Sequence, residues 1–176
     1  KTLFFITALV LSVTEGNAQA PANASCQISV SRQIPFSSTA AKDRLTVSIG
    51  PGACHTAELS VIVVSSSGKV LYRYVAPFKK HVSTQWDDPA LPNDAHQFVK
   101  ETAANALVPI GKRPIAKPKD QIKEGDAEIT VPLALFTRLT SSDQPMLYHP
   151  TYYEGGQYVV FDPASRKAKV VARWGV

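Results

Sequence analysis

The chain has 176 residues, of which 44% are hydrophobic, and its formal net charge at pH 7 is +5. That length suits one domain with a sizeable hydrophobic core. Beyond the amino-terminal end, no stretch is long and apolar enough to predict a helix that spans a membrane.

The amino-terminal end predicts a secretory signal peptide at 1–20. Lys1 precedes a short apolar run, Leu3 to Val13, which is followed by a more polar stretch with small residues. This order is typical of such peptides. Since a cut after residue 20 would leave Pro21 just beyond it, cleavage at 22 or 24 is the alternative. We therefore expect a periplasmic or secreted protein.

The two cysteines, Cys26 and Cys54, predict one disulfide bond. In an oxidising compartment a pair of thiols usually forms a bridge. The alternatives are a catalytic thiol, a metal ligand or a lipid-modified Cys26. The expected bridge would tie the first strand to a later turn.

The first half of the mature chain predicts four antiparallel strands. Apolar and polar residues alternate in CQISVSRQI (26–34) and in RLTVSI (44–49), which is the pattern of half-buried strands. The stretches ELSVIVV (58–64) and KVLYRYV (69–75) flank SSSG, where Gly68 can supply the positive φ of a tight turn. Together these segments predict a β-meander.

The middle of the chain predicts one amphipathic helix in AHQFVKETAANAL, residues 95–107. Asn93 or Asp94 is placed to cap its start, and Pro109 ends it. Its expected apolar face comprises Phe98, Val99, Thr102, Ala103, Ala106 and Leu107.

The second half predicts further hairpins. AEITVPLALF (127–136) is apolar and β-prone, with Pro132 indicating an edge or the end of a strand. GQYVVFD (156–162) and KAKVVARW (167–174) flank a DPAS turn. Residues 21–176 should therefore form a single α+β domain, mainly antiparallel β-sheet built from hairpins, with one amphipathic helix and one disulfide.

A basic, proline-containing loop is predicted at 111–126, GKRPIAKPKDQIKEGD. Its candidate binding residues are Lys112, Arg113, Lys117 and Lys119. They would suit an acidic partner, either an acidic polymer or an envelope protein, and a solvated connector is the simpler alternative. Nucleic acid is not expected, because the loop has no aromatic side chains on which bases could stack.

No local signature of a common enzyme class is present. The chain lacks G-x-S-x-G, H-E-x-x-H, a glycine-rich phosphate loop and C-x-x-C, and its histidines lie far apart in sequence. Neither a metal nor another cofactor is therefore expected. Asp87, Asp88 and Asp94 around Trp86 could supply carboxylates for glycoside hydrolysis, although DDP is also an ordinary turn.

The stretch LYHPTYYEGGQYVVFD, Leu147 to Asp162, is the best candidate site. Pro150 and the pair of glycines predict a loop within it. The candidate binding residues of this loop are Tyr148, His149, Tyr152, Tyr153 and Glu154. Tyrosine offers apolar area with a polar tip at low entropic cost, so this composition is typical of a contact surface. The alternative is that the tyrosines only cap the core.

Part of this stretch, YYEGGQYVVF (152–161), resembles the tyrosine- and glycine-rich strand pair of the periplasmic C-type lysozyme inhibitors, small β-barrels with a disulfide. The Ser-Gly pair before the first tyrosine and the later Lys-Gly of that family are missing here. The resemblance therefore implies an inhibitor-like form of binding, without a role for any single residue.

The sequence thus favours a non-enzymatic binding module of the cell envelope. The alternative is a hydrolase acting on an envelope polymer, through the acids near Trp86 or through His149 with Glu154. The two hypotheses make different predictions about catalysis. A hydrolase would keep its fold and lose turnover when one of these side chains is replaced by a neutral one, whereas a binding protein would show no turnover at all.

Overall fold

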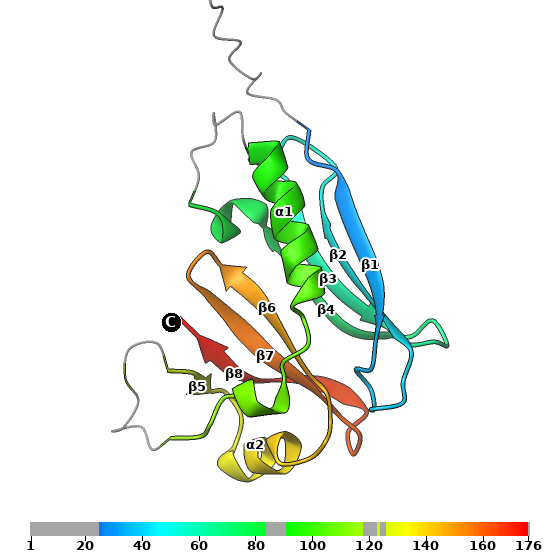
Figure 1. Ribbon diagram of the computed structural model, residues 1–176, viewed down its shortest axis with the longest axis vertical. Helices are drawn as coiled ribbons and strands as arrows, with labels where there is room; N and C mark the ends of the chain where they lie inside the picture. Colours follow the sequence, from blue (N-terminus) through cyan, green and yellow to red (C-terminus); the bar gives the residue numbers. More distant parts are fainter. Residues whose placement is uncertain (1–24, 84–90, 118–122, 124–125, 176) are drawn as a thin grey trace, which may run out of the picture.

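The computed structural model of the chain describes residues 25–83, 91–117, 123 and 126–175 (Figure 1). It contains two antiparallel sheets of four strands each and two α-helices, which confirms the expected α+β class. The predicted signal peptide lies outside the described residues and stays a prediction. Within the described part of the chain, no helix has both the length and the apolar character needed to cross a membrane.

The first sheet is the predicted meander, and its strands pair in sequence order. The strands are β1 (Ile28–Ile34), β2 (Asp43–Ile49), β3 (Glu58–Val64) and β4 (Val70–Pro77). Every second residue of β2 and β3 is buried, because side chains alternate between the two faces of a strand. The sheet therefore needs a covering layer on one face only.

Helix α1 (Leu91–Ala104) packs across β1 and β2 on this apolar face. Its buried residues are Leu91, Ala95, Val99, Thr102 and Ala103, which share one side of the helix. The helix begins before Asn93 and Asp94, so the prediction that they cap its start was wrong. Both lie in the first turn, where the carboxylate of Asp94 is favourable beside the positive end of the helix dipole.

Arg32 on β1 fixes the carboxyl end of α1 to the sheet. Its guanidinium donates hydrogen bonds to the carbonyl oxygens of Ala103 (3.1 Å) and Ala104 (2.8 Å). Carbonyls in the last turn of a helix have no partner within the helix, and a cation there also stabilises the helix dipole. The edge strand is thereby joined to the helix that covers it.

The second sheet has the strand order β5-β8-β7-β6. Its strands are β5 (Glu128–Ile129), β6 (Met146–Tyr152), β7 (Gly155–Asp162) and β8 (Lys167–Trp174). One face of this sheet packs against the first sheet, so that Leu147 and Val159 belong to the main core. Phe161 also meets Phe36, which follows β1, in an edge-to-face contact with 6.2 Å between ring centroids.

Helix α2 (Leu133–Thr140) covers the opposite face of the second sheet, where Phe136 is buried in a smaller apolar cluster. The segment 127–136 was expected to be a strand, but only its residues Glu128–Ile129 pair with β8. Pro132 lacks the N–H that a sheet needs and sits just before the helix, and the leucines and alanine that follow favour helix.

The predicted disulfide between Cys26 and Cys54 is confirmed, with the two Cα atoms 4.8 Å apart. Both residues are buried, and the bridge ties the start of β1 to the turn before β3. It closes a loop with a sequence separation of 28 residues. By the loop-entropy relation, a bridge of this length stabilises the folded chain by about 3–4 kcal/mol.

A Cys26→Ala/Cys54→Ala variant should therefore lose about 3–4 kcal/mol of unfolding free energy, because its unfolded chain regains the loop entropy. Denaturant unfolding of the oxidised wild type and of the variant measures the difference. A reducing agent should destabilise the wild type and leave the variant unchanged. A loss below about 1 kcal/mol would contradict the role of the bridge as a main staple.

Candidate functional site

The tyrosine-rich stretch is a β-hairpin, so the prediction of a loop was wrong. Strand β6 extends to Tyr152, a two-residue turn follows at Tyr153 and Glu154, and β7 begins at Gly155. Pro150 is tolerated within β6 because this strand lies at the edge of its sheet, where one side of the backbone needs no partner.

The paired glycines make room for two tyrosine rings. A side chain at Gly155 would collide with the ring of Tyr152, and one at Gly156 would collide with the ring of Tyr148. The two rings therefore lie against the backbone of their own hairpin, which leaves both tyrosines half-buried. Tyr148 also contacts its cross-strand partner Tyr158, with 5.0 Å between ring centroids.

His149 lies on the other face of β6 and is completely buried, with 0% exposure. Its Nε2 atom is 2.6 Å from the hydroxyl oxygen of Tyr72 on β4 and 3.2 Å from the side-chain nitrogen of Gln157 on β7. Its Nδ1 atom is 2.8 Å from the carbonyl oxygen of Pro150. The imidazole therefore connects the two sheets.

These partners determine which nitrogen carries the proton. A carbonyl oxygen can only accept, so Nδ1–H of His149 donates to Pro150 and Nε2 is the acceptor. The Tyr72 hydroxyl then donates to Nε2, and the amide of Gln157 donates to the Tyr72 oxygen at 2.5 Å. Every polar atom of the imidazole is satisfied without water.

The electrostatic environment keeps this cluster neutral. Burial lowers the pKa of His149 to about 4, since water is not available to solvate the imidazolium. Burial likewise raises the pKa of Tyr72 far above the physiological range. A neutral imidazole with no exposed surface and an occupied Nε2 cannot take a proton from a substrate, so the arrangement is that of a structural anchor.

A second contact between the sheets lies beside the first. The hydroxyl of Tyr74 on β4 donates to the carbonyl oxygen of Thr151 at 3.1 Å and is 3.3 Å from Nε2 of His81. His81 ends the short 3-10 helix η1 (Phe78–His81), and burial lowers its pKa. The ring of Tyr74 also packs against that of His149, with centroids 4.6 Å apart.

Only part of the predicted tyrosine site is available for contact. Tyr153 is 56% exposed and Glu154 is exposed, and both lie on the hairpin turn. A hydrogen bond to the carboxylate of Glu154 raises the pKa of the Tyr153 phenol. Tyr148 and Tyr152 are half-buried, and His149 faces the interior. The hairpin tip is therefore the exposed part of the site.

The four basic candidates have different environments. Lys112 is exposed in the 3-10 helix η2 (Ile110–Lys112), and Lys117 forms an ion pair with Asp126 at 2.7 Å. Arg113 donates to three carbonyl oxygens at and beyond the end of α2, those of Thr140, Ser142 and Gln144. Lys119 lies outside the described residues.

Of the acidic candidates near Trp86, the structure describes only Asp94. Asp94 is exposed in the first turn of α1, while Trp86, Asp87 and Asp88 lie outside the described residues. Among the residues that the structure places, no three histidine, cysteine, aspartate or glutamate side chains gather closely enough to hold a metal ion.

The sequence reasoning missed Tyr72, Tyr74 and Gln157. The alternation of the strand could have pointed to the two tyrosines, since Tyr72 and Tyr74 lie on one face of β4 while Arg73, between them in sequence, is exposed on the other face. That pattern assigns both tyrosines to the inner face, but it cannot show that a histidine 77 residues further along the chain lies opposite Tyr72.

Comparisons with known proteins gave no match, whether with protein-family models, with curated protein sequences or with solved structures.

A Tyr72→Phe variant should be less stable than the wild type by about 1–3 kcal/mol, because Nε2 of the buried His149 loses its hydroxyl donor. Thermal or denaturant unfolding measures the loss. Tyr153→Phe is the matched control: its hydroxyl lies on the exposed turn, so its stability should stay within about 0.5 kcal/mol of the wild type. An equal loss of unfolding free energy in the two variants would contradict the role of the Tyr72–His149 hydrogen bond as a structural anchor.

The stability of the protein should fall as pH drops from about 6.5 toward 4. The folded-state pKa of His149, about 4, lies below its unfolded value of 6.5, so in this window the unfolded chain binds more protons. The contribution is complete above pH 6.5 and decreases on acidification by at most about 1.4 kcal/mol per pH unit. Unfolding free energies measured from pH 7 to 5 should show a shallower slope in a His149→Gln variant. An identical slope would contradict burial of a neutral imidazole.

Proposed function

We propose that this protein is a non-enzymatic binding module of the cell envelope, periplasmic or secreted, which contacts its partner through the tip of the β6–β7 hairpin. The observation that carries the proposal is an exposed tyrosine, Tyr153, on a two-residue turn whose strands are fixed to the core. The disulfide supports the compartment, since such bridges are typical of proteins in oxidising environments.

The anchoring of the hairpin favours binding at its tip. His149 and Thr151 of β6 are hydrogen-bonded to Tyr72 and Tyr74 of the first sheet. A surface that is already held in one conformation loses less entropy when a partner binds. Tyrosine adds a large contact area at the cost of few rotatable bonds, which is why it is frequent at the energetic centres of interfaces.

The chemistry of the tip indicates the kind of partner. The ring of Tyr153 offers apolar area, and the carboxylate of Glu154 accepts hydrogen bonds from cations or amides. A protein surface with an apolar pocket beside a basic group would match both. Lys112 adds an exposed cation in the basic loop, which suits an acidic region of the same partner. Inhibition of an envelope enzyme is one concrete form of this function.

A hydrolase acting on an envelope polymer gains no support from the described residues. His149 is sealed inside the protein while Glu154 lies on the exposed turn, so the two do not form an acid–base pair. Asp94 remains exposed on α1, and the other acids of that group lie outside the described residues.

The proposal predicts that a Tyr153→Ser variant loses a partner that the wild type captures from envelope extract, because the ring at the tip is removed. The measurement is a comparative pull-down with the oxidised mature chain. A Leu133→Ser variant is the control, since Leu133 is a large apolar side chain that is 62% exposed on α2, and α2 lies away from the tip (Figure 1). It should retain the partner, and all three baits should have equal thermal stability.

Two results would contradict this function. The first is capture of the same partner by the wild type and by Tyr153→Ser with equal recovery. The second is hydrolysis of cell-wall material by the purified wild type that disappears when Asp94 is changed to asparagine.

A further inference from the structure

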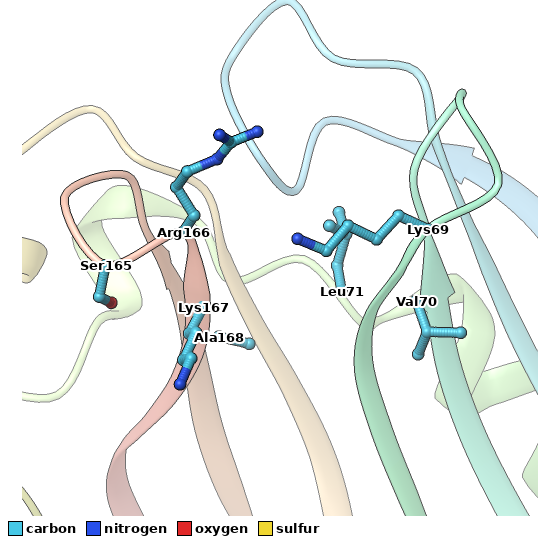
Figure 2. A pocket seen from close by; sticks show the side chains of 7 residues that line it. All are labelled: Lys69, Val70, Leu71, Ser165, Arg166, Lys167 and Ala168. Atoms are coloured by element: carbon cyan, nitrogen blue, oxygen red, sulfur yellow. The ribbon is translucent and has the colours of Figure 1, made fainter.

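A groove with basic walls lies at the end of the second sheet opposite the tyrosine tip. Strand β7 begins at that tip and ends at the β7–β8 turn, which lies beside the β3–β4 turn of the first sheet (Figure 2). The groove between the two turns has a volume of about 570 Å³. It is lined by Lys69, Val70, Leu71, Ser165, Arg166, Lys167 and Ala168.

The groove carries exposed positive charge on both of its turns. Lys69 reaches across from the β3–β4 turn toward the β7–β8 turn, which carries Arg166 and leads into Lys167 (Figure 2). All three residues are exposed, and none of them forms an ion pair with any residue that the structure describes. Like charges placed on facing turns repel one another, so the fold alone gives no reason for this arrangement.

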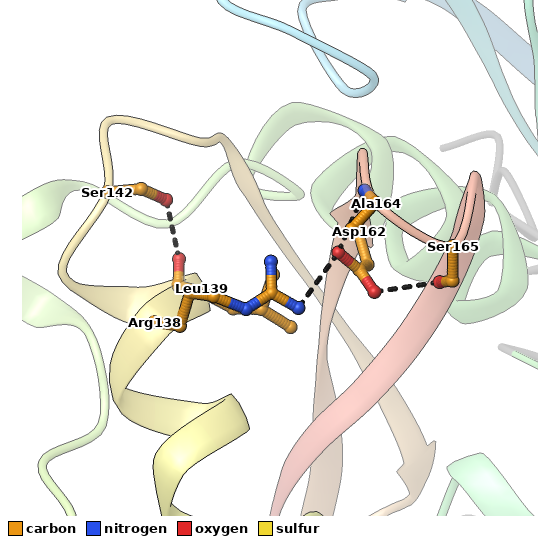
Figure 3. Close-up of polar contacts among 6 residues, drawn as sticks. All are labelled: Arg138, Leu139, Ser142, Asp162, Ala164 and Ser165. Carbon is orange, nitrogen blue, oxygen red and sulfur yellow. Dashed lines mark hydrogen bonds and ion pairs between the residues drawn. The ribbon is translucent and has the colours of Figure 1, made fainter.

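The carboxylate at the end of β7 is used elsewhere. Asp162, at the end of β7, is only 4% exposed and accepts hydrogen bonds from the Ser165 hydroxyl (2.7 Å), the Ala164 backbone N–H (3.2 Å) and Arg138 (3.1 Å) (Figure 3). These donors, Ser165 first, lower the pKa of Asp162 and keep it charged. Since Arg138 on α2 already balances that charge, the groove itself stays positive.

The backbone of Arg166 gives an independent indication. Its φ is +54°, in the left-handed region that glycine adopts without strain and that residues with a Cβ atom disfavour. Glycine would suit this turn better, and arginine is the residue present. A strained conformation retained at a position with an exposed charge is typical of a functional residue.

We propose that this groove binds a soluble ligand that carries two or more phosphate groups. A guanidinium and an ammonium group match phosphate oxygens, with Arg166 able to bond in a bidentate manner and Lys69 acting as a point charge, while the ammonium of Lys167 points away from Lys69 and adds positive charge at the margin of the groove (Figure 2). The hydroxyl of Ser165 already donates to Asp162, so the cations provide the recognition. Leu71 and Ala168 supply an apolar wall for the non-phosphate part of the ligand.

The shape of the site favours a soluble ligand over a membrane surface. The groove is open to solvent over much of its surface, but its volume of about 570 Å³ is in the range of sites for small molecules, whereas a bilayer presents a flat layer of headgroups that would contact only the two exposed turns. Binding to anionic vesicles is therefore an alternative that the experiment separates.

The test is calorimetric titration of the oxidised mature chain with sodium tripolyphosphate at low salt. Arg166→Gly should weaken binding about tenfold or more, as expected for the loss of hydrogen bonds to a charged group, and should keep or raise the melting temperature because it relieves the backbone. Lys69→Ser should weaken binding to a similar extent. Lys100→Ser is the matched control, since it removes the same charge from an exposed position on α1, and its dissociation constant should stay within about twofold of the wild type.

Three results would overturn the proposal. One is no measurable binding of tripolyphosphate by the wild type. Another is an equal loss of affinity in Lys100→Ser and Arg166→Gly, which would indicate a general effect of net charge. The last is sedimentation of the protein with phosphatidylglycerol vesicles without binding of tripolyphosphate, which would assign the basic surface to membranes.

Discussion

The hydrogen bond from the hydroxyl of Tyr72 to Nε2 of His149 is the constraint on which the arrangement of the two sheets depends. An apolar interface between sheets can slide, because hydrophobic contact has no preferred direction. A buried imidazole can be satisfied only where its donors and acceptors meet it, so its bonds to Tyr72 and Pro150 define one position. Gln157 completes the cluster by bonding to the Tyr72 oxygen.

That constraint gives strand β6 two roles. Its inward residues, Leu147 and His149, hold the hairpin to the core, while its end carries the turn with Tyr153 and Glu154 into solvent. The second sheet therefore offers a different surface at each end of β7: an aromatic and acidic tip at one end, and the basic groove at the other. The two surfaces have opposite chemistry.

The fold was largely predictable where the sequence has a strong local period. The alternation in 58–64 and 69–75 gave the β3–β4 hairpin, and the two cysteines gave the disulfide. Prediction was incomplete around two prolines. Pro132 was taken to indicate an edge or the end of a strand, and β5, which ends before it, is an edge strand, but the helix that begins after Pro132 was not predicted. Pro150 was assigned to a loop and lies in the edge strand β6, and an edge position cannot be recognised without knowing which segments become neighbours.

The candidate site was predictable in composition and not in arrangement. The tyrosines of the hairpin were recognised, but which of them would be half-buried follows from the contacts of Tyr148 and Tyr152 with Gly156 and Gly155. Similarly, His149 was expected in a contact loop and is sealed inside, because its partner Tyr72 comes from a distant strand. Alternation within a strand says which face a residue occupies, and only tertiary structure says what that face meets.

The most direct test of this account is the protonation state of His149. Nitrogen-15 NMR of protein labelled at histidine, with the signal assigned by its loss in a His149→Gln variant, reports both ring nitrogens. We expect a neutral imidazole with the proton on Nδ1 at pH 5.5, as its burial and its bond to the Pro150 carbonyl require. An imidazolium at that pH, or a proton on Nε2, would contradict the structural role of His149 and return it to consideration as a catalytic group.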